Sequence, residues 1–144
     1  MDKPNGMKEE IISKFNGLTW HDAKLIDFSF YRNSANENEI RMGLVFESTN
    51  GWSPLHWLTF EDSTFVNVDV DLEGKRVCSD SIASAACSEH SDWVISLSQA
   101  SPYDDFSEYL HFKISLIPPG GSINILAKSF LLTEAHRGLP SGPG

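Results

Sequence analysis

The chain has 144 residues, of which 40% are hydrophobic, 11% aromatic and 22% charged, and its mean hydropathy is −0.24. This length suits one domain, and the composition excludes both a wholly disordered chain and a membrane-spanning one. Eleven Lys and Arg against twenty Asp and Glu give a net charge of −9, which argues against a protein that binds a phosphate backbone and allows a basic partner.

The two ends of the sequence suggest the compartment of the protein and the extent of its domain. Residues 1–20 contain no apolar run of the kind that signal peptides have, so the expected compartment is the cytoplasm. Cys78 and Cys87 are expected to remain thiols in that reducing environment. A single domain is predicted over residues 1–138, followed by a flexible Gly/Pro-rich tail over residues 139–144.

The first predicted element is a short amphipathic helix over Met7–Phe15, which ends at Asn16-Gly17. The hydrophobic period then changes to two, which predicts strands with one buried face. The apolar residues of the first two strands are Ile26, Phe28 and Phe30, then Ile40, Met42, Leu44 and Phe46.

Alternation continues through His56, Leu58 and Phe60. In the next predicted strand Val66, Val68, Val70 and Leu72 face one way. The segment Ser79–Ser91 has no clear period, and Ser91–Leu97 fits either a strand or a helical turn. A closing hairpin is predicted from Leu110–Leu116, a turn at Pro118–Gly121, and a last strand from Ile123 to about Thr133.

Six or seven strands at antiparallel spacing with one N-terminal helix predict a mainly β (α+β) fold. The expected architecture is an antiparallel β-sandwich or a strongly curved sheet, with the helix on one side. The edge strands of such a sheet could pair two copies, which leaves a homodimer open.

An acidic segment has the spacing of a calcium-binding loop. Oxygen-bearing residues occupy positions 1, 3, 5 and 12 of such a loop, with glycine at position 6: Asp69, Asp71, Glu73, Asp80 and Gly74. A strand period precedes them, and Arg76 stands where a hydrophobic residue is typical. A solvated strand face that runs into a Gly turn is therefore favoured, and no metal or other cofactor is predicted.

The sequence contains no motif for nucleophilic catalysis, metal binding or nucleotide binding. Gly-x-Ser-x-Gly, HExxH, paired Cys and Gly-rich phosphate loops are all missing. The histidines are scattered, so each is expected to make a local hydrogen bond. No catalytic residue is predicted.

The net negative charge is concentrated between Glu61 and Glu108, which holds eleven acidic residues and two basic ones. An acidic surface with aromatic anchors can steer and hold a basic protein. The alternative is a surface that only keeps the protein in solution. The binding residues predicted on this basis are Asp69, Asp71, Glu73, Asp92, Trp93, Tyr103, Asp104 and Asp105.

A short motif, Trp20-His21-Asp22-Ala23-Lys24-Leu25, follows the predicted helix. It resembles the Trp/Phe-His-Asp-Ala-x-Leu signature of small β-rich bacterial proteins, including the immunity protein 50 family of polymorphic toxin systems. The closing hairpin at Phe112–Ala127 is similar to the end of such proteins. The resemblance implies cytoplasmic binding and neutralisation of a cognate toxin. From the residues alone, the side chains of Trp20, His21, Asp22 and Leu25 are expected to be structural where helix gives way to strand.

Three functional hypotheses follow. The leading one is a non-enzymatic protein-binding module for a basic protein, with neither nucleic acid nor membrane as partner. The second is a small-molecule-binding β domain whose pocket is aromatic, lined by Trp52, Trp57, Phe60, Phe112 and Phe130. The third is an enzyme or metal-dependent protein that uses His21, Asp22 and one remote histidine.

Overall fold

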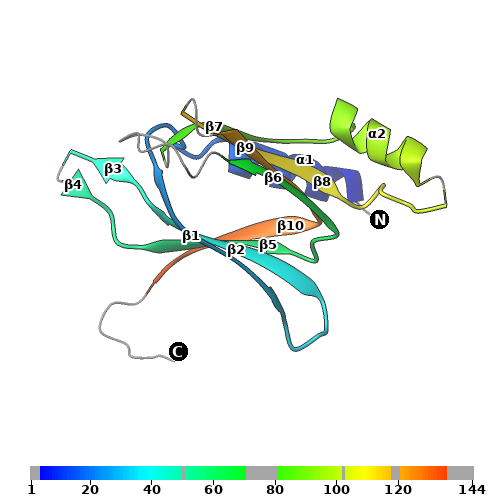
Figure 1. Ribbon diagram of the computed structural model, residues 1–144, viewed down its shortest axis with the longest axis horizontal. Coiled ribbons are helices and arrows are strands. Elements are labelled where there is room, and N and C mark those ends of the chain that lie inside the picture. The colour runs from blue at the N-terminus through cyan, green and yellow to red at the C-terminus, as the bar shows by residue number, and fades with distance from the viewer. Residues whose placement is uncertain (1–3, 50, 71–80, 102, 118–120, 136–144) are drawn as a thin grey trace.

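The computed structural model describes residues 4–49, 51–70, 81–101, 103–117 and 121–135. Within them the chain forms two four-stranded antiparallel sheets, a small two-stranded sheet and two helices (Figure 1). The mainly β class with an N-terminal helix, predicted from the sequence, is confirmed.

Each large sheet combines strands from distant parts of the sequence. The first sheet has the order β1 (Lys24–Arg32), β2 (Asn38–Val45), β5 (His56–Glu61) and β10 (Ser129–Glu134). The second sheet has the order β6 (Phe65–Val70), β9 (Gly121–Ala127), β8 (Leu110–Leu116) and β7 (Ile82–Ser88). The short strands β3 (Glu47–Ser48) and β4 (Gly51–Trp52) pair with each other.

Two bent segments connect the large sheets. β5 leads into β6 through a corner at residues 62–64, where Asp62 has a positive φ of 52°. β9 leads into β10 at Lys128, whose N–H donates to the Glu61 carbonyl at 3.0 Å. The prediction of one last strand from Ile123 to Thr133 is therefore wrong, because the chain leaves one sheet and enters the other at Lys128.

Residues 82–100 in the middle of the chain form a strand and a helix. The Ser/Ala-rich segment without a clear period contains β7, and residues 92–100 form helix α2 (Asp92–Ala100). Of the two alternatives for Ser91–Leu97, the helical one is confirmed. No helix among the described residues is long and apolar enough to cross a membrane.

Strand β1 departs from the predicted face. Its pairing with β2 shifts between Leu25 and Asp27, so that Leu25, Phe28 and Phe30 lie opposite the buried residues of β2. Ile26 lies at this irregularity and is 55% exposed. The prediction that Ile26 and Phe30 are buried is wrong, since Phe30 is 62% exposed although it faces inward. β2 has the predicted inner face, and its Ile40, Met42 and Leu44 are buried.

The core lies between the sheets, and helix α1 (Pro4–Asn16), which contains the predicted Met7–Phe15 helix, contributes the completely buried Phe15 to it. The ring of Phe15 lies 5.0 Å from those of Phe112 and Phe130 and 4.6 Å from that of Trp20, measured between ring centroids. Phe112 belongs to the second sheet and Phe130 to the first. One helical side chain therefore contacts both sheets.

We expect Phe15→Ala to lower the free energy of unfolding by about 3–5 kcal/mol, because it leaves a cavity where helix and sheets meet. Met7→Ala on the same helix is the matched control, since Met7 is exposed; its effect should stay within about 0.5 kcal/mol. Urea unfolding followed by circular dichroism measures both. Equal effects of the two substitutions would contradict this account of the core.

Candidate functional site

Helix α2 and the segment that follows it carry five of the eight predicted binding residues, and three of these five are acidic. Asp92, Tyr103, Asp104 and Asp105 are exposed, and the Tyr103 side chain is 100% exposed. Together with the exposed Glu108 they form what we call the α2 surface. Helix α2 projects from one end of the second sheet (Figure 1).

The sequence at the start of α2 favours a helix. Ser91 is the N-cap, and its hydroxyl oxygen accepts a hydrogen bond from the Val94 N–H at 3.3 Å. The Asp92 carboxylate lies in the first turn, where the helix dipole stabilises negative charge. Below the helix, a small hydrophobic cluster of Val94, Phe106 and Leu126 fixes it to the sheet.

A buried polar chain also holds the start of α2. His111 is 6% exposed, and its Nδ1 lies 2.6 Å from Ser91 Oγ, while its Nε2 lies 2.7 Å from Asn124 Oδ1. Because an amide oxygen only accepts, Nε2 carries the proton and Nδ1 accepts from the Ser91 hydroxyl. Burial lowers the pKa of His111 from its ordinary value, which favours this neutral form.

A serine hydroxyl bonded to a neutral imidazole is also the arrangement that activates a nucleophile. Here Ser91 Oγ also accepts from the helix, and the Trp93 ring lies 4.6 Å from the His111 ring. These contacts indicate that the hydrogen-bonded chain of Ser91, His111 and Asn124 supports the start of α2. Sequence reasoning missed it because residues 91, 111 and 124 come together only in the folded sheet; the Ser-Asp start of a helix was the one local signal.

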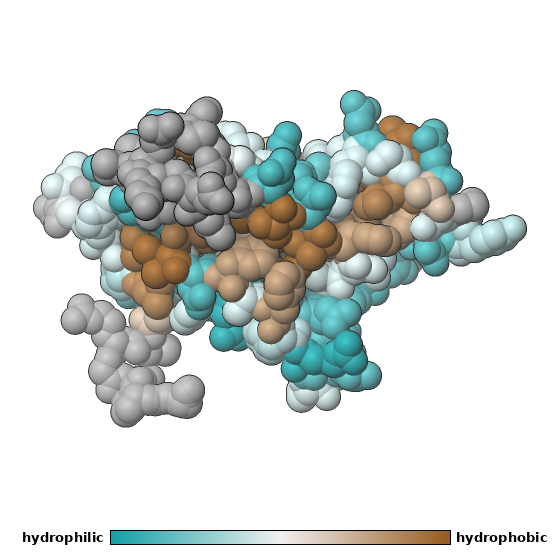
Figure 2. All heavy atoms as spheres, viewed as in Figure 1, coloured by the Kyte–Doolittle hydropathy of each residue, from teal (hydrophilic) through white to brown (hydrophobic). Residues whose placement is uncertain are grey.

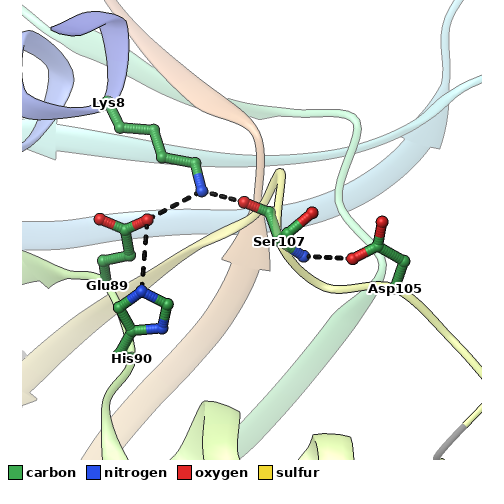
Figure 3. Close-up of polar contacts among 5 residues, drawn as sticks. All are labelled: Lys8, Glu89, His90, Asp105 and Ser107. Atoms are coloured by element: carbon green, nitrogen blue, oxygen red, sulfur yellow. Dashed lines mark hydrogen bonds and ion pairs between the residues drawn. The ribbon is translucent and has the colours of Figure 1, made fainter. Parts of the chain in front are cut away.

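The segment after α2 is tied to helix α1 by Lys8 (Figure 3). The Lys8 ammonium forms an ion pair with Glu89 at 2.9 Å and donates to the Ser107 carbonyl. Two residues earlier, the Asp105 carboxylate accepts from the Ser107 N–H at 2.9 Å, which lowers the pKa of Asp105. The backbone near Asp105 is therefore held at both the N–H and the carbonyl of Ser107.

Lys128 fixes the end of this segment. Its ammonium lies 3.1 Å from the carboxylates of Asp62 and Glu108, and these hydrogen bonds raise its pKa. In the described part of the chain, neither Asp92 nor Asp104 takes part in an ion pair. Their charges are therefore available to a partner.

The structure brings together only part of the predicted binding set. Trp93 lies on α2 but turns towards His111 and is partly buried. Asp69 is exposed on β6, four residues along the strand from Phe65, which packs below α2. At about 3.3 Å per residue, Asp69 lies roughly 13 Å from Phe65 along the strand.

Some of the predicted residues cannot be placed. Asp71, Glu73 and the rest of the calcium-loop pattern after Asp69 lie outside the described residues. So does Cys78, whereas Cys87 is a buried free thiol whose pKa burial raises to about 12.

The Trp20–Leu25 motif joins three elements. The buried Trp20 indole N–H donates to the Phe15 carbonyl at 2.8 Å, at the end of α1. Asp22, with a φ of 70°, donates its backbone N–H to Ile82 of β7 at 2.8 Å. His21 is exposed and lies 3.2 Å from the Ala83 carbonyl and 3.6 Å from the Asp22 carboxylate. Leu25 starts the inward-facing side of β1 and is partly buried. These contacts give the motif a structural use.

One pocket is relevant to the enzyme hypothesis. His21 and His56 line the same pocket of 260 Å³, together with Glu47. His56 lies 2.9 Å from the Pro54 carbonyl and packs its ring against Phe46. Among the described residues, no group of three or more His, Cys, Asp or Glu is arranged to hold a metal ion.

The predicted aromatic pocket is not formed. Phe60 and Phe112 are completely buried, with ring centroids 5.0 Å apart, so they fill the core. Trp57 alternates with the inward-facing Leu58 and therefore lies on the opposite face of β5, and Trp52 is half exposed on β4. The five aromatic residues do not share one cavity.

Comparison with protein-family models, with curated proteins and with solved structures gives no match.

We expect the His111 contacts to make stability depend on pH. The pKa of His111 is lower in the folded protein than its ordinary value of 6.5. The unfolded chain therefore takes up the proton first, and the stabilisation present above that value is lost as the pH falls through the folded-state pKa. His111→Gln should remove this part of the pH dependence, whereas His90→Gln at an exposed position should retain it.

Urea unfolding of the wild type and both variants at several values between about pH 7.5 and pH 5.5 measures the effect. Because carboxylates also titrate in acid, the informative quantity is the difference between variant and wild type at each pH. An unchanged difference across the range would contradict the role given to His111.

Proposed function

We propose that the protein is a non-enzymatic binding module that holds a basic partner protein on the α2 surface. This proposal rests on the fully exposed Tyr103 and on the adjacent Asp104, which forms no ion pair with the residues that the structure describes. Aromatic side chains supply much of the affinity at protein interfaces, and acidic groups around them steer a basic partner. The contacts of Lys8, Lys128 and His111 hold this surface in place, so little conformational freedom has to be lost on binding.

The immunity role is the form of this function that we propose. The Trp20–Leu25 motif, through its resemblance to bacterial immunity proteins, supports a toxin as the partner and the cytoplasm as the place of binding. A net charge of −9 suits a basic toxin. A toxin that acts on nucleic acid would have such a charge, because it must bind phosphates.

The test is purification of the tagged protein from its own cells with three baits: the wild type, Tyr103→Ala and Glu10→Lys. Glu10 is exposed on α1, outside the α2 surface. We expect the wild type and Glu10→Lys to retain one basic protein in stoichiometric amount. Co-expression of the wild type should also relieve the growth arrest that this protein causes.

Tyr103→Ala should weaken binding to the captured protein by about 2 kcal/mol, or roughly thirtyfold, as expected for a central aromatic anchor. Titration calorimetry with the purified partner measures this loss. Equal binding by all three baits, an acidic partner, or no stoichiometric partner would each contradict the proposal.

Asp104→Lys should act mainly on the association rate, because an exposed charge at the rim steers the encounter. We expect slower association and a weaker dependence of the rate on salt between about 50 and 500 mM. Glu10→Lys makes the same change in net charge and is the control. If both variants slow association equally, total charge and not the α2 surface is responsible.

A further inference from the structure

The sandwich is open on the side where β1 and β6 lie. Both are edge strands: among the described residues β1 pairs along its length only with β2, and β6 only with β9. A groove of 370 Å³ lies between them, lined in part by Phe30, Ile40, Phe65 and Val66.

The inner face of the second sheet extends into this opening. Val66 and Val68 lie directly opposite Ile125 and Ile123 of β9, so the four side chains share one face. Both isoleucines are buried, whereas Val66 is 37% and Val68 49% exposed. Hydrophobic surface is visible between the two layers in Figure 2.

The same is true of the first sheet. Phe30 lies opposite the buried Ile40, yet it is largely exposed. Side chains that would be covered in a closed sandwich are thus open to solvent along two strand edges. Grouped apolar exposure of this kind marks a site of interaction.

We propose that β6 accepts an extended segment of a partner protein in which apolar residues alternate with basic ones. The unpaired edge of a strand supplies main-chain hydrogen-bonding groups to an added strand. Alternate side chains of that strand would lie beside Val66 and Val68 on the inner face, which requires apolar residues there.

Charge complementarity sets the other positions. The opposite face of β6 presents Asn67 and Asp69, both exposed. A lysine or arginine beside Asp69 forms a favourable cross-strand pair, while an acidic residue there is repelled. The net charge of −9 acts in the same direction and disfavours a second copy of this chain at the edge.

This surface is distinct from the α2 surface, although the two adjoin. Phe65 lines the groove and also packs against Phe106 below α2, with ring centroids 5.6 Å apart. Val68 lies outside the α2 surface and Tyr103 does not line the groove, so loss of one surface can be tested separately from loss of the other.

The probe is a capped hexapeptide of alternating valine and lysine, added to the isotope-labelled protein and followed by NMR. We expect it to shift the backbone amides of residues 65–69 and to slow their hydrogen exchange. The same peptide with glutamate in place of lysine should leave them unchanged.

Val68→Lys should weaken binding of the valine-lysine peptide by about tenfold, since it puts charge where an apolar side chain should dock. Leu131→Lys is the matched control, because it also replaces an apolar residue by lysine and Leu131 is 50% exposed on β10. It should alter the affinity by less than about twofold. Tyr103→Ala should also leave peptide binding unchanged.

Three results would overturn the proposal: peptide shifts centred on α2 and not on β6, equal loss in Val68→Lys and Leu131→Lys, or no binding by the wild type. Analytical ultracentrifugation tests whether a second copy of this chain occupies the groove. A wild-type dimer that Val68→Lys converts to a monomer would assign the groove to a second copy and also overturn the proposal. Unchanged circular dichroism of both lysine variants verifies that they are folded.

Discussion

The contact of Phe15 with aromatic side chains from both sheets determines how the rest of the molecule is arranged. Phe60 and Phe130 come from the first sheet and Phe112 from the second, and all three rings surround the Phe15 ring. Aromatic pairs at these separations add to the stabilisation that comes from burial alone. These contacts fix the C-terminal end of α1 against both sheets.

The position of α1 has consequences at both of its ends. At its C-terminal end, the Asn16 side chain accepts from the Cys87 N–H at 2.7 Å and donates to the Cys87 carbonyl at 3.2 Å, which satisfies backbone groups of β7. Towards its N-terminal end, Lys8 reaches the Ser107 carbonyl. The segment that presents Asp105 is thus aligned by a helix whose place is set by the core. The exposed carboxylate of Asp105 depends, through these contacts, on packing far from it.

Local patterns explain why the sequence predicts most strands correctly. Alternation in β2, β5 and β8 is regular, because each of these strands has one face in the core and two neighbouring strands. The errors occur where a tertiary contact interrupts the period. Ile26 is misplaced by the irregular pairing near Leu25, and the break at Lys128 follows from the transfer of the chain between sheets. No pattern within a few residues contains that information.

The candidate site is predicted in part for the same reason. Composition reveals the acidic segment, and it correctly identifies Tyr103 and Asp104 as surface residues. It gives no sign that Trp93 turns inward onto His111, since that contact joins residues on a helix and a distant strand. The openness of the groove is equally hidden. Val66 and Val68 have the alternation of a buried face, but they lie on a strand that pairs, among the described residues, only with β9, and they are 37% and 49% exposed.

The two surfaces differ in what they can contribute to binding. Exposed carboxylates act over about a Debye length, so those of the α2 surface affect mainly how fast the proposed basic partner arrives and in which orientation, while Tyr103 supplies affinity on contact. Apolar side chains act only on contact, and their desolvation affects how long a complex lasts. Because Phe65 links the groove to the packing below α2, one partner can reach both surfaces without spanning the molecule. A partner held at both gains affinity from the second contact at little further entropic cost, since the first has already fixed its position.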